Sequence, residues 1–283
     1  MSNNLEILEN YGTTIGTYEH SLPNALELAK GRLPLVVVMQ EPCNLADEVP
    51  YEEMVYGDES AEGVRERVGC PALQQVEHLA EEVSGGTYSL EDFSVFDINT
   101  LHSKDMQDDL QNLEADLHTA HQTFWKMLTT KAPKVILVLT CTACSSQYRP
   151  LKSLYSSRIS AATEDTITLW RNSTSHKATV IRAFHPSVYL RDDYIEAEKW
   201  SQDEVLLANK ILRLCFAKAF RILSGEPCAE DDREEALLQA WKDTVGARNR
   251  SRALKENSRN ADLQSEVALV LADKMGALSI GGK

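Results

Sequence analysis

Three short apolar runs rich in β-branched residues constrain the fold of this chain more than any other feature. They cover residues 34–39, 134–140 and 178–184, and a weaker run covers residues 93–98. Turn-forming residues bound each run, and each has about the length of a buried strand. Strands that are apolar along their whole length are typical of parallel sheets covered on both faces. The sequence therefore predicts an α/β fold.

Helical patterns separate these runs. Apolar residues from Met106 to Met127 recur at spacings of three and four, which predicts a long amphipathic helix that ends before Pro133. Two more helices are predicted over residues 71–83 and 203–223. Strands that alternate with helices predict a three-layer α/β/α sandwich with a mainly parallel central sheet. The stretch between the third and the last predicted strand is Ser-rich and basic, and we interpret it as irregular.

The composition changes after Gly225, and this change suggests a division of the chain. We predict an N-terminal segment of residues 1–30, an α/β domain of residues 31–225 and a helical C-terminal extension of residues 226–283. The extension contains two predicted helices, over about residues 232–245 and 261–275, separated by an Arg-rich run over residues 248–259. Such a run is typical of an exposed linker, a nuclear-targeting signal or a partner-binding patch. The C-terminal helices are therefore a candidate surface for a protein partner.

Charge is distributed unevenly along the chain. The formal net charge is −14, which argues against a generally basic coat for nucleic acid. Residues 1–130 carry a net charge of −18, whereas residues 131–190 carry +6. The basic part mixes cations, hydroxyls and aromatic rings, which are groups that contact phosphates and stack on bases. A local basic cleft for DNA is thus compatible with the acidic total, and its candidate phosphate contacts are Arg149, Lys152 and Arg158.

Polar residues follow the predicted strands, where the ligand of an open parallel sheet usually binds. Glu41 comes after the first strand, Asn99 after the weaker one and His185 after the last one. A carboxylate, an amide and an imidazole together suit cleavage of an N-glycosidic bond, in which the sugar becomes cationic and the base leaves as an anion. On spacing alone, the alternative is that these residues end strands and cap helices.

Four motifs in series resemble those of the uracil-DNA glycosylase superfamily. They are Gln40-Glu41-Pro42, Ile98-Asn99, the strand and loop from Val135 to Cys144, and His185-Pro186-Ser187. The match covers about residues 31–225, with the motifs in the family's order and at the ends of predicted strands. The resemblance implies a uracil-DNA glycosylase-like fold and a base that is flipped out of DNA into a pocket.

The resemblance also implies a role for each matched residue. Glu41 would position water and support the sugar cation, and His185 would stabilise the departing base anion. The implied substrate-binding residues are Gln40 through its backbone amide, Asn99 on the base edge, Ser187 on a phosphate and Tyr189 in the loop that enters the duplex.

Retention of catalysis is left open, because Met39 and Glu41 stand where the best-known motif has Gly and Asp. One alternative is a catalytically inactive member of the same fold that binds nucleic acid or protein. Another is an acidic partner-binding protein or DNA mimic.

Neither a metal nor another cofactor is expected. Cys141 and Cys144 form a Cys-x-x-Cys pair, but the chain has no second such pair to complete a zinc site. His118 and His121 lie beside the apolar stripe of the long helix, and we interpret them as surface or rim histidines. The start has no signal-peptide pattern, and the longest apolar run is far below the roughly 20 residues of a membrane helix. We expect a soluble intracellular protein, nuclear or cytoplasmic.

Overall fold

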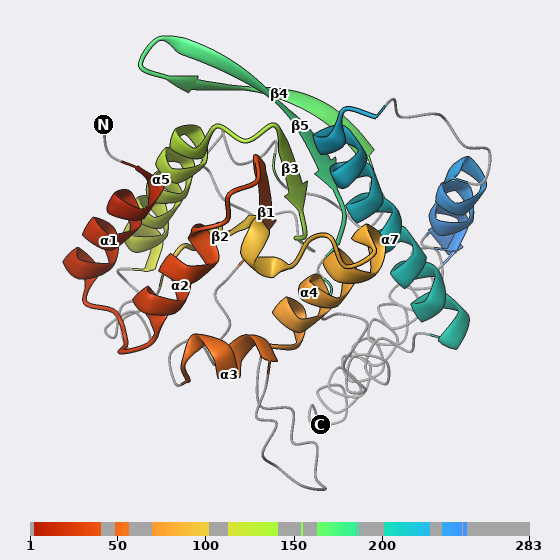
Figure 1. Cartoon of the computed structure of the whole chain (residues 1–283), viewed down its shortest axis with the longest axis horizontal. Coiled ribbons are helices and arrows are strands. Elements are labelled where there is room, and N and C mark those ends of the chain that lie inside the picture. Colours follow the sequence, from red (N-terminus) through yellow and green to blue (C-terminus); the bar gives the residue numbers. More distant parts are fainter. Residues whose placement is uncertain are drawn as a thin grey trace, which may run out of the picture. The chain divides into compact units, whose positions relative to one another are not determined.

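The structure is a computed structural model, and it divides the chain into two compact units, Met1–Leu238 and Gln239–Lys283. The residues that it describes are 3–40, 49–56, 70–101, 113–140, 154, 163–184, 186, 201–226, 234–244 and 246–247. The first unit contains the sheet and the helices that cover it (Figure 1).

A five-stranded sheet forms the centre of this unit. Its strands are β1 (Leu35–Met39), β2 (Ser94–Asp97), β3 (Val135–Val138), β4 (Thr163–Arg171) and β5 (Thr174–Arg182). Their order across the sheet is β2-β1-β3-β5-β4. All neighbouring pairs are parallel except β4 and β5, which are antiparallel. The predicted α/β fold with a mainly parallel sheet is confirmed, as are the four strands predicted from apolar runs.

The strand β4 corrects the interpretation of the stretch before residue 178 as irregular. Thr163–Arg171 and Thr174–Arg182 form a hairpin, joined by Asn172 and Ser173 with φ of 47° and 68°. Two consecutive positive φ angles define a type I′ turn, whose twist matches that of the flanking strands. The missed signal was the alternation of polar and apolar residues, most of them β-branched, along Thr166-Ile-Thr-Leu169, which is typical of a half-exposed strand.

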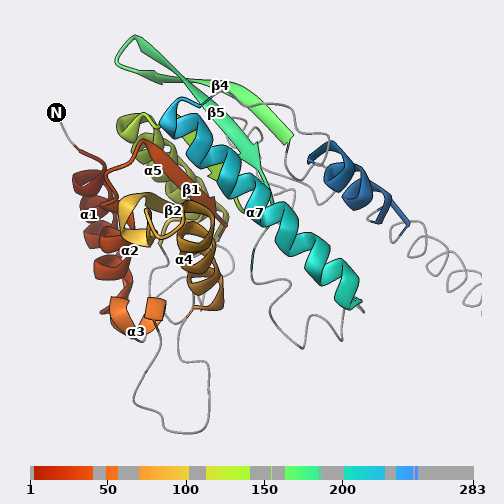
Figure 2. The ribbon, with the colours of Figure 1, turned by 45° about the vertical axis from the view of Figure 1, so that its right-hand side comes forward.

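Helices cover both faces of the sheet (Figures 1 and 2). They are α1 (Asn4–Ile15), α2 (Ser21–Ala29), α3 (Tyr51–Tyr56), α4 (Pro71–Ser84), α5 (Leu113–Lys131) and α7 (Gln202–Ser224), with a 3₁₀ turn, η2, at Leu90–Asp92. The helices predicted over residues 71–83 and 203–223 are confirmed as α4 and α7. Each ends at a glycine with left-handed φ, Gly85 at 63° and Gly225 at 78°.

The long predicted helix is confirmed from Leu113 onward as α5, and its earlier part lies outside the described residues. Residues 234–244 are helical, within the first of the two predicted C-terminal helices. The second of those helices lies outside the described residues.

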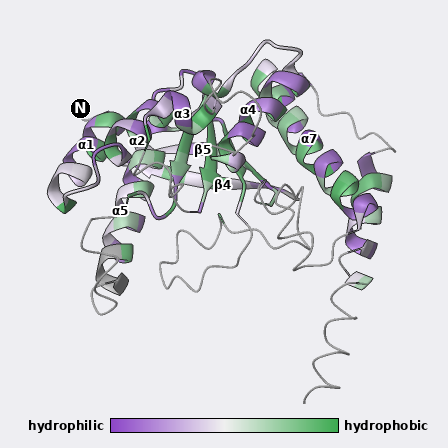
Figure 3. Cartoon of the chain, turned by 90° about the horizontal axis from the view of Figure 1, so that it is seen from below, coloured by the Kyte–Doolittle hydropathy of each residue, from purple (hydrophilic) through white to green (hydrophobic). Residues whose placement is uncertain are grey.

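The hydrophobic core has one layer on each side of the sheet. On the side of α1, α2 and α5, sheet residues such as Val38 and Phe96 pack with Leu8 and Phe124. The N-terminal segment therefore forms two helices, the first of which enters this core. On the other side, α4 and α7 contact each other, and the ring centroids of Phe220 and Phe216 are 6.2 Å apart. Figure 3 shows hydrophobic strands at the centre and helices along which hydrophobic and hydrophilic residues alternate.

The strand order places a topological switch point between β1 and β3. The chain passes from β1 to β2 on one side of it, and then to β3 on the other. In sheets of this kind, the connections diverge at the switch point and leave a crevice outside the carboxyl ends of the two strands. The carboxyl edge of β1 and β3 is therefore where a ligand site is expected.

Candidate functional site

Three parallel strands end at the same level of this edge. The residues that the register aligns across β1, β3 and β5 are Val38, Val138 and Arg182. The ladder continues past the strands, with backbone hydrogen bonds from Leu139 to Val38 and from Ala183 to Val138, both of 2.8 Å. The carboxyl edge of the sheet thus carries the residues two positions beyond this aligned set, which are Gln40, Thr140 and Phe184.

The structure places Gln40 and Asn99 side by side at this edge. The backbone N–H of Asn99 donates to the carbonyl oxygen of Gln40 over 3.0 Å, one step beyond the bond from Ile98 to Met39. Both side chains are half-buried. The other predicted site residues lie outside the described residues: Glu41, His185, Ser187, Tyr189, Arg149, Lys152 and Arg158.

The side chain of Asn99 is held by a histidine from α5. His121 Nε2 lies 3.0 Å from Asn99 Oδ1, and His121 is buried, with 4% of its surface exposed. Burial lowers the pKa of His121, and the nearby His118 lowers it further, so the imidazole is neutral near pH 7. Because a carbonyl oxygen can only accept, the contact with Oδ1 corresponds to the tautomer that carries its proton on Nε2.

This contact corrects the interpretation of His121 as a surface or rim residue, whereas the same interpretation of His118 is confirmed. His118 is exposed, with its Nε2 atom 2.8 Å from Nε2 of Gln122. His121, in contrast, lies within the core. The missed signal was helical spacing, because His121 is three residues before Phe124 and follows the buried Ala120.

A second contact anchors the loop after β2 to α5. Thr100 Oγ1 lies 3.2 Å from the carbonyl oxygens of Asp97 and of Ala120. Asn99 and Thr100 thus contact α5 at two successive residues, Ala120 and His121. Their combined effect is to fix the Asn99 amide at the carboxyl edge, because neither the loop backbone nor the side chain can rotate without losing a hydrogen bond.

The groups that meet here can recognise a polar, flat ligand. The Asn99 side chain carries both an NH₂ donor and the Oδ1 acceptor that lies against His121. Asp97 contributes a half-buried carboxylate next to it, in register with Met39, and Thr140 contributes a buried hydroxyl at the end of β3. Among the described residues, no group of three or more His, Cys, Asp or Glu side chains is arranged to hold a metal ion.

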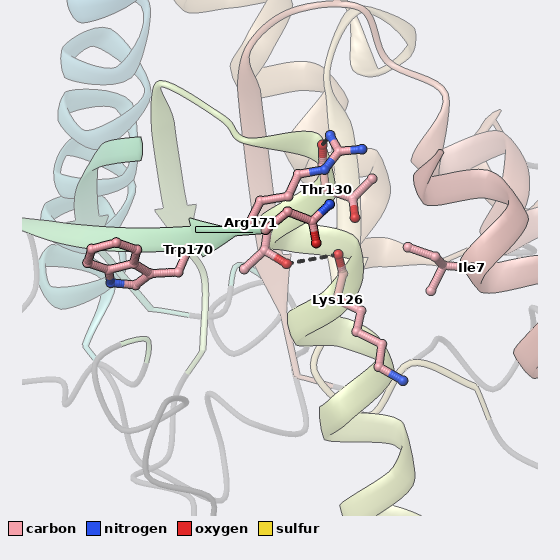
Figure 4. Close-up of a pocket in the computed structure, with 7 residues that line it drawn as sticks. Ile7, Lys126, Thr130, Trp170 and Arg171 are labelled. Atoms are coloured by element: carbon pink, nitrogen blue, oxygen red, sulfur yellow. Dashed lines mark hydrogen bonds between the residues drawn. The ribbon is translucent and has the colours of Figure 1, made fainter. Parts of the chain in front are cut away.

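A pocket of about 370 Å³ lies at the opposite end of the sheet (Figure 4). It is lined by Ile7, Lys126, Thr129, Thr130, Trp170, Arg171 and Asn172. These residues belong to α1, to the end of α5 and to the β4–β5 turn, near where β3 begins. The pocket is therefore separate from the carboxyl edge.

Comparison with known proteins leaves this site without a family: no protein-family model matches the chain, and no curated protein matches it. Within the described part of the chain, every helix is too short or too polar to cross a membrane.

Proposed function

We propose that this protein binds a flipped base of DNA at the carboxyl edge of its sheet and hydrolyses the base's N-glycosidic bond. It would thus act as a divergent uracil-DNA glycosylase-like enzyme. The observation that carries the proposal is the orientation of the Asn99 amide by the buried, neutral His121, next to Gln40. The motif resemblance adds the identity of the ligand, uracil or a related base.

A fixed amide can distinguish uracil from cytosine. Uracil presents an N–H donor at N3 and an acceptor oxygen at position 4, whereas cytosine presents an acceptor and a donor at these places. An Asn side chain matches uracil with its carbonyl oxygen toward N3 and its NH₂ toward the oxygen. In the tautomer with its proton on Nε2, His121 donates to Oδ1 and favours the amide orientation that matches uracil, because a flipped amide would direct an N–H donor at that proton.

The strand spacing supports a ligand between the two proposed catalytic residues. Glu41 and His185 are the next residues in sequence after Gln40 and Phe184, which lie just beyond the ends of β1 and β5 on either side of β3. Neighbouring strands lie about 4.8 Å apart, so the ends of β1 and β5 are separated by about 10 Å. This separation suits a sugar near β1 and its base toward β5.

The proposed reaction assigns each group a task in one bond cleavage. The C1′–N bond breaks and its electron pair leaves with the base, whose negative charge the imidazole of His185 stabilises by donating a hydrogen bond. The carboxylate of Glu41 stabilises the sugar cation and accepts a proton from the water that forms the new C1′–O bond. The products are a free base and an abasic sugar.

A second candidate function is base binding without hydrolysis. It is favoured by Met39, whose side chain is buried where the best-known motif has Gly. A side chain before the motif restricts how closely the backbone can approach a base. In this case the same edge would hold a flipped base, and the protein would serve as a nucleic-acid-binding module.

An assay of base release tests the proposal. The full chain is incubated with single-stranded and duplex DNA carrying one uracil, and abasic sites are revealed by alkaline cleavage. We expect release by the wild type and a loss of at least about 100-fold for Asn99→Ala, because the base loses the hydrogen bonds that hold it in the transition state. The matched control is His118→Gln, an exposed residue of the same helix, which should keep wild-type activity.

Binding of the same oligonucleotides separates the two candidates. Uracil-dependent binding without release supports the binding module. A folded protein that neither releases uracil nor distinguishes it from thymine in binding would rule out both candidates.

A further inference from the structure

The strand β4 is the last strand of the sheet and has an open edge. Within the described residues it pairs with β5 on one side and with no strand on the other. Alternate residues of β4 are exposed, namely Glu164, Thr166, Thr168 and Trp170. Trp170 has 64% of its surface in solvent. Figures 1 and 2 show the hairpin reaching beyond the helices that cover the rest of the sheet.

The hairpin geometry determines which backbone groups this edge presents. In a hairpin with a two-residue loop, the two residues that flank the loop exchange both backbone hydrogen bonds. Arg171 and Thr174 are that pair, so Arg171 and every second residue before it face β5. The N–H and C=O groups of Thr166, Thr168 and Trp170 therefore point away from β5, toward the open edge.

The centre of this edge lacks the features that usually prevent strands from pairing. Exposed edges are commonly interrupted by charged side chains, by proline or by a bulge. From Thr166 to Trp170 the strand has no charge and no proline, and its pairing with β5 continues without a break. Charges stand only at its two ends, with Asp165 at one and Arg171 at the other. A strand with opposite charges at its ends is complementary to itself in an antiparallel arrangement.

We propose that β4 pairs antiparallel with β4 of a second copy of this chain, joining the two sheets into one across a two-fold axis. The axis passes through Thr168, which then faces the partner's Thr168. In this register Asp165 lies opposite the partner's Arg171, and the symmetry repeats each contact once. The backbone groups that point to the open edge meet in the dimer as hydrogen-bonded pairs.

The side chains fit this register on both faces of the sheet. Ile167 lies opposite the partner's Leu169 on the face toward α5, where both already pack with the core. Thr166 lies opposite the partner's Trp170 on the other face, which covers the exposed indole. Aromatic residues beside β-branched ones form favourable cross-strand pairs.

The polar pocket beside the hairpin turn has room for the charged end of the partner strand. Arg171 lines it together with Lys126, and Arg171 Nη1 donates to the carbonyl oxygen of Thr130 over 3.0 Å (Figure 4). The partner's Asp165 would approach the pocket on this face. In the single chain, the Asp165 side chain is 58% exposed and lies 3.3 Å from Arg182 Nη2, so it can reach a second cation.

The charge pattern favours a second copy over nucleic acid. Glu164 and Asp165 are both exposed at one end of β4 and would repel a phosphate chain that followed the edge. Lys126 and Arg171 are the only cations that line the pocket. Two cations suit one carboxylate, whereas proteins that bind single strands line a groove with cations along several nucleotides.

Charge exchange tests this arrangement in the full-length protein. Molar mass is measured by sedimentation and light scattering from about 1 to about 100 µM, a range that covers reversible dimers with small interfaces. We expect a dimer for the wild type. Asp165→Arg and Arg171→Asp should each weaken it at least 10-fold, because each variant places like charges opposite one another twice. An equimolar mixture of the two variants should restore dimers, since every facing pair then has opposite charges.

A backbone variant and a surface variant complete the test. Thr168→Pro removes the N–H that points to the open edge and keeps the bonds to β5, so it should also weaken the dimer at least 10-fold. Lys177→Glu, an exposed charge change on β5, should leave the dimer intact and serves as the matched control. Thermal unfolding confirms that each variant is folded. A wild type that stays monomeric, or a dimer that survives both Thr168→Pro and the single charge exchanges, overturns the proposal.

Discussion

The contact between His121 and Asn99 joins a buried helix residue to a residue of the candidate site. Sequence spacing could place Asn99 after a strand, because strand ends follow from a local apolar pattern. It could not show that a histidine 22 residues later donates to its side chain. That contact depends on where α5 crosses the sheet, and it makes a half-buried loop residue an oriented amide.

Burial of this histidine makes stability depend on pH. The pKa of His121 is lower in the folded state than its usual value of about 6.5, so below that pH the unfolded chain takes up the proton more readily. The contribution of neutral His121 to the free energy of unfolding is thus complete above about pH 6.5 and is lost as pH falls through the folded pKa.

Urea unfolding of the wild type and of His121→Gln checks this expectation. Glutamine keeps a donor for Asn99 but does not titrate, so the stability of the variant should fall less than that of the wild type between about pH 7.5 and about pH 5. His118→Gln removes the neighbour that adds to the lowering of the pKa of His121, so its slope should be slightly shallower than that of the wild type. Equal slopes for the wild type and His121→Gln would show that His121 does not titrate on unfolding in this range.

At the scale of elements, the local pattern of apolar and polar residues predicted some strands and helices and missed others, and each outcome has a physical reason. The fully apolar strands were predictable because a strand buried on both faces is a continuous apolar run. The helices α4 and α7 were predictable because a helix buried along one stripe repeats its apolar residues every three or four positions. The strand β4 was missed, since half of its residues face solvent and its polar residues made the stretch look irregular. The N-terminal helices were not predicted, although Asn3 forms a capping box with Glu6 at the start of α1.

The connection from α2 to β1 passes very close to the start of β2, and a glycine permits this approach. A Cβ atom on Gly31 would lie 2.0 Å from the carbonyl carbon of Phe93 and 2.3 Å from its oxygen. Because these are backbone atoms, no side-chain rotation can relieve the clash. Nearby, Ser94 Oγ donates to the carbonyl oxygen of Ala29 over 2.9 Å, which holds the two segments together.

Replacement of this glycine should therefore destabilise the fold severely. We expect Gly31→Ala to lower the free energy of unfolding by about 3 kcal/mol or more, the upper range for overpacking. Gly85→Ala is the matched comparison, because a Cβ there meets nothing within 4 Å and only the left-handed φ of 63° is unfavourable. That variant should lose about 1 kcal/mol. Equal losses in chemical unfolding would contradict the close approach at Gly31.

At the scale of the whole molecule, a partly buried ion pair joins residue 234 to α7. Lys218 Nζ contacts Glu234 Oε1, and the two side chains are only 9% and 14% exposed. Arg221 Nη2 lies 3.7 Å from the other carboxylate oxygen of Glu234. One carboxylate thus faces two cations, which compensates much of the cost of removing Lys218 from water.

Loss of this carboxylate should be costly because a poorly hydrated ammonium group would remain. We expect Glu234→Gln to lower the free energy of unfolding by about 3 kcal/mol, measured by urea unfolding. Glu235→Gln removes an exposed charge at the next residue and should change stability by less than about 0.5 kcal/mol. Similar values for the two variants would mean that Glu234 is as well hydrated as its neighbour.

The sequence by itself determined the identity of most elements and the polar character of the loops that follow the strands. The spacing of apolar residues, the length of an apolar run and a glycine at a helix end are local properties, so they can be recognised in the sequence without knowledge of the fold. Only the tertiary structure decided that β2 and β3 flank β1, that His121 meets Asn99 and that no described strand pairs with the outer edge of β4. These features arise from contacts between segments far apart in the chain, and such contacts leave no fixed spacing in the sequence.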